Sequence, residues 1–96
     1  MKIRVIFKKF RDGEREVIAF FPGTYGSHEV NRYNILSYMH MGQHAEASID
    51  CYRRCVPASE DEYAKLLAEL KSIYRGDELV VRKRMSANDF RHHDWR

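Results

Sequence analysis

Four polar side chains that can bind a ligand or move a proton lie close together in the middle of this sequence. They are Tyr38, His40, Gln43 and His44, with Gly42 among them. Histidine titrates near neutral pH, so His44 can serve as a general base, with Tyr38 and Gln43 as hydrogen-bond donors. The same side chains can instead hydrogen-bond to loop backbone and fix the following connection. The pattern therefore predicts either a ligand-binding or catalytic site at a strand end, or a structural network.

The two histidines also belong to a second group, whose side chains are of the types that bind metal ions. This group is His40, His44, Cys51 and Cys55. Imidazole and thiolate groups are the usual ligands of a tetrahedral zinc ion, although the two pairs are not joined by the usual linker length. Without an export signal we expect a reducing compartment, in which both cysteines are free thiols packed as small apolar groups. We therefore expect no metal or other cofactor, and zinc bound by these four residues is the alternative.

Cations and aromatic residues are expected to share one face of the first predicted strands, which is typical of a nucleic-acid surface. Cations meet phosphates, and aromatic rings stack on bases. The residues concerned are Arg4, Lys8, Phe10, Arg15 and Phe21, with Arg82, Lys83 and Arg84 further along the chain. A net charge of only +3 makes a weak electrostatic footprint, so an ordinary solvated surface is the alternative interpretation.

A protein partner is the competing prediction. An open sheet edge can accept a partner strand, and Tyr25, Tyr33, Tyr52 and Trp95 are of the type that anchors interfaces when exposed. Self-association through an uncovered sheet face or an edge strand is a further hypothesis, because a small core gives only marginal stability. We expect a protein partner or a homodimer ahead of nucleic acid, and no membrane partner.

The composition is that of one globular domain. The chain has 96 residues, of which 44% are hydrophobic and 32% charged. No apolar run approaches the roughly 18 residues that a membrane span needs, and the charged N-terminus does not resemble a signal peptide, so we expect a cytoplasmic protein. No P-loop, nucleophile elbow or dinucleotide motif is present, so the sequence favours binding over catalysis.

Residues 2–21 predict a β-hairpin. Asp12 and Gly13 favour a two-residue type I′ turn, which pairs Phe7 with Ile18 and Lys9 with Glu16. This register predicts a core face made of Ile3, Val5, Phe7, Ile18 and Phe20. The opposite face is then half-covered or free to bind something.

A third strand is expected at 34–41, where apolar residues continue up to Gly42. Residues 43–58 have no clean period, and we expect a long ordered loop with a helical turn around 50–54.

The most specific local signal predicts a helix at about 60–75. Ser59 and Glu62 form a capping box, and Tyr63, Leu66, Leu67 and Leu70 follow at helical spacing. A final strand is expected at 78–84. Residues 85–96 are polar and without a period, and we expect a loose tail unless Phe90 and Trp95 dock.

Several segments are distinctive when taken together. The most specific is Ser-Tyr-Met-His-Met-Gly-Gln-His at 37–44, accompanied by Val-Ile-Ala-Phe-Phe-Pro at 17–22 and Leu-Val-Val-Arg at 79–82. With these segments, residues 3–84 resemble a group of small uncharacterised proteins encoded on bacterial plasmids, conjugative elements and related mobile DNA. The resemblance implies a genetic context and no assigned activity. The longer loop at 23–33 and the cysteine pair depart from the group's pattern.

These patterns predict an α+β fold in the order β-β-β-α-β, with one helix packed on one face of a small, mainly antiparallel sheet. The domain is expected to span 1–84 and the tail 85–96. The predicted function is that of a cytoplasmic, non-enzymatic accessory protein of bacterial mobile DNA that binds another macromolecule. Nucleic-acid binding through the basic and aromatic face, and a ligand-binding or catalytic site around Tyr38, His40, Gln43 and His44, are the alternatives.

Overall fold

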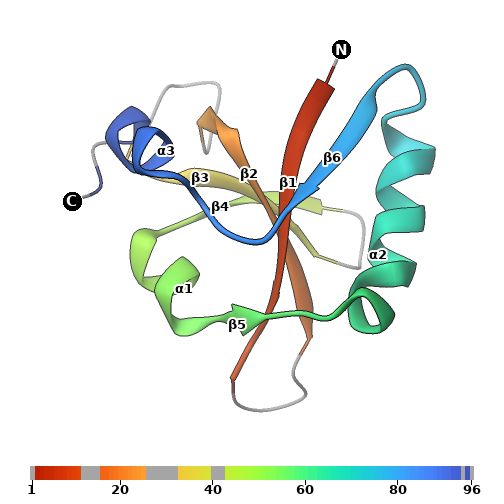
Figure 1. Cartoon of the computed structure of the whole chain (residues 1–96), viewed down its shortest axis with the longest axis horizontal. Helices are drawn as coiled ribbons and strands as arrows, with labels where there is room; N and C mark the ends of the chain where they lie inside the picture. The colour runs from red at the N-terminus through yellow and green to blue at the C-terminus, as the bar shows by residue number, and fades with distance from the viewer. Residues whose placement is uncertain (1, 12–15, 26–32, 40–42, 94, 96) are drawn as a thin grey trace.

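A twisted β-sheet runs through the centre of the molecule (Figure 1). The computed structural model describes residues 2–11, 16–25, 33–39, 43–93 and 95, and within these six strands form the sheet. The strands are β1 (Lys2–Lys9), β2 (Val17–Tyr25), β3 (Ile35–Met39), β4 (Gln43–Ala47), β5 (Val56–Pro57) and β6 (Glu78–Arg82). The helices are α1 (Ile49–Arg54), α2 (Glu60–Ile73) and α3 (Ala87–His92).

The strand order across the sheet is β4-β3-β2-β1, and both β5 and β6 lie beside the remaining edge of β1. β5 pairs antiparallel with the C-terminal end of β1, whereas β6 runs parallel to Lys2–Ile6. All other strand pairs are antiparallel. The predicted α+β class with a mainly antiparallel sheet is therefore confirmed.

The predicted register of the first hairpin is wrong by one residue. Phe7 lies opposite Ala19 rather than Ile18, and Phe10 donates its amide hydrogen to the carbonyl oxygen of Glu16 at 3.1 Å. A two-residue turn at 12–13 cannot give this pairing, because five residues separate 10 from 16. A slip of one residue turns a whole strand over, so Ile18 and Phe20 lie on the face opposite Phe7. The expected turn residues Asp12 and Gly13 lie outside the described residues.

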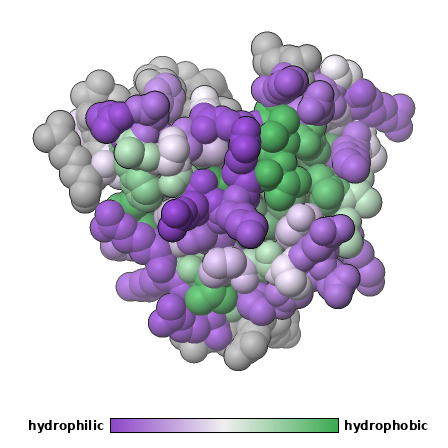
Figure 2. Space-filling view, in the orientation of Figure 1, coloured by the Kyte–Doolittle hydropathy of each residue, from purple (hydrophilic) through white to green (hydrophobic). Residues whose placement is uncertain are grey.

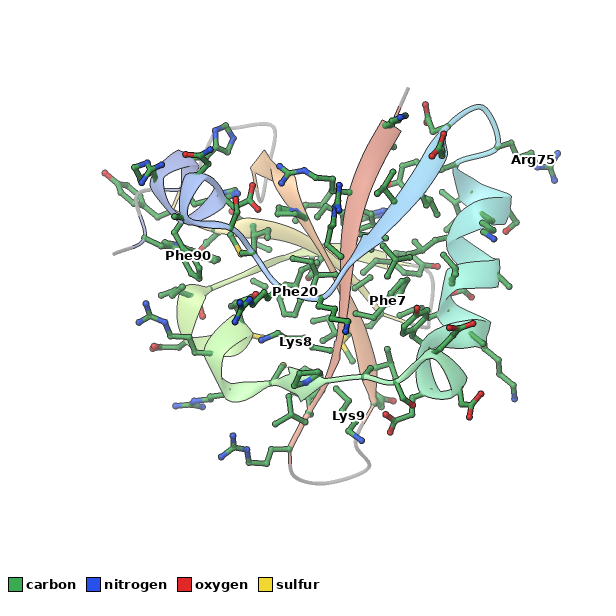
Figure 3. The ribbon with its side chains drawn as sticks, in the orientation of Figure 1. Phe7, Lys8, Lys9, Phe20, Arg75 and Phe90 are labelled. Atoms are coloured by element: carbon green, nitrogen blue, oxygen red, sulfur yellow. The ribbon has the colours of Figure 1, made fainter. Side chains whose placement is uncertain are left out.

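As a result, both faces of the sheet are covered (Figure 1). Figure 3 shows Phe7 on the α2 side of β1, and Phe20 on the side of α1 and α3. The core under α2 comprises Val5, Phe7, Ala19, Phe21, Tyr38, Leu66 and Leu70. The core under α1 and α3 comprises Ile6, Ile18, Phe20, Ile35, Ala47, Tyr52, Cys55, Met85 and Trp95. The prediction of one uncovered face is thus wrong.

The helix predicted from the capping box is confirmed as α2. The Ser59 hydroxyl accepts from the Glu62 amide, and the Glu62 carboxylate accepts from the Ser59 amide at 2.8 Å. The carboxylate of Glu62 also contacts the ammonium group of Lys9 at 2.6 Å, which ties the first turn of α2 to β1. Leu66 and Leu70 bury one side of the helix against the sheet.

The connection at 43–58 contains more structure than its sequence suggests. The helical turn is confirmed as α1, with the Ser48 hydroxyl accepting from the Cys51 amide. Residues 43–47, however, form strand β4 rather than a loop, and 56–57 form β5. Gln-His-Ala-Glu-Ala has low strand propensity, so this strand depends on backbone pairing with β3.

The C-terminal segment docks on the sheet through both aromatic residues named above. Trp95 is buried in the second core and Phe90 packs against it. Asp89 anchors α3, since its carboxylate accepts from the Ser86 amide and contacts the Arg4 guanidinium at 2.8 Å. The buried ring of His93 donates from Nε2 to the Pro22 carbonyl oxygen at 2.8 Å. The described part of 85–96 therefore packs on the domain rather than extending from it.

The leucine of α2 that faces the sheet most completely is Leu70, whose exposed fraction is 0%. Leu70→Ala should lower the free energy of unfolding by about 2–5 kcal/mol, because it removes apolar contacts and leaves a cavity. Ile73→Ala on the same helix is the control, since Ile73 is 46% exposed and should change stability by only about 0.5 kcal/mol. Urea unfolding followed by circular dichroism measures both. Equal effects would contradict the packing of α2 described above.

The Asp89 carboxylate should make the docking of α3 depend on acidity. Burial alone would raise the pKa of Asp89, but hydrogen bonds from Arg4 and Ser86 outweigh it and hold the pKa below 3.8. A lowered pKa in the folded state stabilises the fold above the unfolded value, and that contribution disappears as the pH falls through the folded value.

Asp89→Asn should therefore cost about 1–3 kcal/mol at pH 7 and flatten the loss of stability below about pH 4. Melting temperatures measured from pH 2 to 7 test this, with Asp50→Asn on the exposed side of α1 as the control. A pH profile of Asp89→Asn that parallels the wild type would argue against this role of Asp89.

Candidate interaction surface

The structure brings together two of the four polar residues predicted to form a site. Tyr38 in β3 and His44 in β4 are cross-strand partners, and their ring centroids are 4.8 Å apart. Two further residues contact this pair. Glu69 on α2 hydrogen-bonds to the Tyr38 hydroxyl, and the hydroxyl of Tyr74, just after α2, is 2.8 Å from His44 Nε2. His40 lies outside the described residues, as does the side chain of Gln43.

Ionisation of this cluster is set mainly by burial. Burial lowers the pKa of His44, so the imidazole is neutral at pH 7 and can accept a hydrogen bond from Tyr74. Burial, followed by the neighbouring Glu69, raises the pKa of Tyr38, so its hydroxyl keeps its proton. Tyr38 is only 1% exposed, which leaves no access for a substrate to its hydroxyl. The geometry supports a structural network that holds α2 against β3 and β4.

If the network is structural, breaking it should destabilise the fold. His44→Ala and Tyr74→Phe each remove the same hydrogen bond, which contributes about 0.5–1.5 kcal/mol. For a domain of this size we expect the melting temperature to fall by about 4–8 °C per kcal/mol. Glu46→Ala, an exposed position on the same strand, is the control. Unchanged melting temperatures for both variants would favour a ligand site over a structural role.

Of the residues suggested for zinc, His44 lies apart from the two cysteines, and His40 lies outside the described residues. Cys55 is buried in the core under α1 and α3, whereas His44 contacts Phe21 and Tyr38 on the α2 side of the sheet. Both cysteines are free, and burial raises the pKa of Cys55 to about 11, so its thiol stays protonated. Within the described part of the chain, no group of three or more His, Cys, Asp or Glu side chains is placed to hold a metal ion.

The residues suggested for nucleic-acid binding do not share one surface either. Phe21 is buried under α2, while Arg4 on the opposite face is paired with Asp89. The Lys8 ammonium is buried over the Tyr52 ring, 3.9 Å from its centroid, and donates to the Tyr52 carbonyl oxygen. Phe10 is half-buried against the second core, and Arg15 lies outside the described residues.

Exposed cations gather instead in two hollows at the sheet margin. One, of about 710 Å³, lies between β5, the start of α2 and the end of β6, and its basic lining residues include Arg82, Lys83 and Arg84. The other, of about 680 Å³, is lined by Phe10, Arg11, Cys51, Arg53 and Arg54. The basic residues therefore lie along a margin and not across a sheet face.

An apolar strand, β6, lies at an edge of the described sheet. Among the described strands β6 pairs only with β1, so the backbone groups along its other side have no strand partner. Figure 2 shows a hydrophobic surface between β6 and α2. Val81 on β6 is 36% exposed, Ile73 on α2 is 46% exposed, and Leu79 is half-buried. At the other edge, β4 presents the more polar run His44, Ala45 and Glu46.

Comparisons with protein-family models, curated proteins and solved structures found no match to this chain. The assignment of a functional surface therefore depends on the geometry described above. None of the helices in the described residues has the length and apolar character needed to cross a membrane.

Proposed function

We propose that this protein is a non-enzymatic binding module that captures a partner polypeptide by adding a strand at β6. The observation that carries the proposal is the combination of an unpaired strand edge with the apolar residues Leu79, Val80 and Val81. Soluble proteins normally protect such an edge with lysine, proline or a bulge, because it pairs readily with another strand. Strand addition supplies affinity through backbone hydrogen bonds and specificity through alternate side chains.

The faces of β6 define the chemistry of the partner. Leu79 and Val81 pair with Ile3 and Val5 of β1, and so point to the α2 side. A partner strand therefore needs apolar side chains on that side. At the C-terminal end of β6 the basic hollow favours acidic residues in the partner, because opposite charges across an interface set its register.

The wider biological role rests on the resemblance to proteins of bacterial mobile DNA. In that setting the module would act as a cytoplasmic accessory protein, an environment that suits its two free cysteines. A protein partner is favoured over nucleic acid because the residues expected to bind nucleic acid are engaged within the fold. Phe21 is buried under α2, Arg4 is paired with Asp89, and the Lys8 ammonium is buried over the Tyr52 ring. A ligand or catalytic site at Tyr38 and His44 is less favoured, since Tyr38 is closed to solvent.

Val81→Lys should reduce the amount of captured partner at least about tenfold, because a charged side chain on an edge strand opposes strand addition. Ala45→Lys is the matched control: it places the same side chain on an exposed position of β4, the opposite edge strand, and should leave capture intact. Both variants and the wild type are used as bait in a bacterial lysate, and the captured protein is quantified by mass spectrometry.

Two outcomes would contradict the proposal. Equal loss of capture in the two lysine variants would mean that β6 is not the docking strand. Release of the captured material by nuclease would show that nucleic acid is the partner.

A further inference from the structure

We infer that the strand received by β6 is β6 of a second copy of this chain, in antiparallel orientation around a two-fold axis at Val80. This inference rests on the proposed strand addition and names its occupant. A second copy fits because the edge is complementary to itself in charge and in apolar character. Symmetric dimers use the same patch on both subunits, so self-complementarity is the property such an interface requires.

The sequence of the edge shows this complementarity directly. Around β6 it reads Asp77-Glu78-Leu79-Val80-Val81-Arg82-Lys83, with acids at one end and bases at the other. Antiparallel pairing about Val80 places Glu78 opposite Arg82 of the partner's strand, and Asp77 opposite its Lys83. Leu79 then lies opposite Val81. Opposite charges across an antiparallel pair stabilise it, as do apolar pairs, while parallel in-register pairing would place like charges together.

The faces of the two sheets also match. A two-fold axis perpendicular to the sheet keeps the α2 side of one copy on the same side as the α2 of the other. Leu79 and Val81 point to that side in both copies, since they pair with Ile3 and Val5 of β1. Glu78 and Arg82 point to the opposite side together with Val80, since they pair with Lys2, Ile6 and Arg4 of β1. The joined sheet would thus bury the hydrophobic surface seen in Figure 2.

The other edge of the sheet lacks these properties. The β4 sequence Gln-His-Ala-Glu-Ala carries no lysine or arginine to pair with Glu46 and no run of branched apolar residues. On the β6 side of β1, the short β5 ends in Pro57, which has no amide hydrogen to donate to a further strand. Among the described strands β6 is therefore the one suited to pair with itself.

Charge reversal tests the inference with the full chain. The wild type should form a weak dimer, with a dissociation constant of about 10–100 μM, because a five-residue strand pair is smaller than a standard interface. Glu78→Arg or Arg82→Glu alone should weaken dimerisation at least about tenfold, since each places like charges opposite one another at both ends. An equimolar mixture of the two variants restores every charge pair and should form a heterodimer of wild-type affinity.

Sedimentation velocity and native mass spectrometry measure these states, and circular dichroism checks that each variant is folded. Glu46→Arg on β4 is the matched control and should dimerise like the wild type. If Glu78→Arg or Arg82→Glu fails to fold, Asp77→Lys and Lys83→Asp form a second pair of the same design just outside the strand.

Only monomer at about 500 μM wild type would overturn the second copy as occupant, since edge pairing of this strength must be populated there. A dimer unaffected by the single reversals, or one that the mixture does not restore, would overturn the antiparallel register. Failure of the inference is distinguishable from failure of the proposed function. A monomeric wild type that still captures a protein, and loses it in Val81→Lys but not in Ala45→Lys, retains strand addition with a different partner.

Discussion

Burial of β1 on both of its faces is the constraint on which the rest of this structure depends. Val5, Ile6 and Phe7 are consecutive apolar residues, and side chains of a strand alternate between its two faces. All three are buried, so each face of the sheet needs its own cover. One face receives the leucines of α2, and the other receives α1, α3 and Trp95. A chain of this length satisfies that requirement only by returning its C-terminal segment to the sheet.

The cations of β1 connect the sheet to each of the three helices. Arg4 pairs with Asp89 in α3, Lys8 lies over Tyr52 in α1, and Lys9 contacts Glu62 at the start of α2. All three side chains therefore contribute to cohesion of the fold, including Arg4 and Lys8, which suggested a nucleic-acid surface in the sequence. In the case of Lys8, burial lowers the pKa of the ammonium group, and its interactions with the ring and the carbonyl of Tyr52 partly offset that cost.

Because both faces of the sheet are covered, we propose that binding takes place at an edge of the sheet. The long α2 helix closes one side of β1, and β6 then returns parallel to it as an outer strand. Its outer backbone groups have no strand partner among the described residues, and its side chains are apolar between two charged ends. The proposed strand addition at this edge, by a second copy or by another polypeptide, would pair the side of β6 that no described strand covers.

The sequence alone determined the elements whose signals are local. The capping box at Ser59 and Glu62 predicted α2, and the strand expected at 78–84 corresponds to the shorter β6. Together with the first hairpin they were sufficient for the α+β class. The sequence also grouped Tyr38 with His44 as neighbours along the chain, but their cross-strand pairing depends on β4, which the sequence did not predict. Their partners Glu69 and Tyr74 lie on and just after α2, far along the chain, and the sequence carried no signal for these contacts.

Tertiary structure decided the features that depend on contacts between distant segments. The observed hairpin register differs from the predicted one by one residue, which places Ile18 and Phe20 on the opposite face of the sheet. The turn-forming residues do not fix whether the connecting loop has an odd or an even number of residues, and that number sets the register. Strand β4 arose from pairing with β3 in spite of its low propensity, and α3 docked because Asp89 meets Arg4 from the far end of the chain. Local propensity and capping act over a few residues and can be read from sequence, whereas register, face coverage and the open edge are set by the packing of the whole chain.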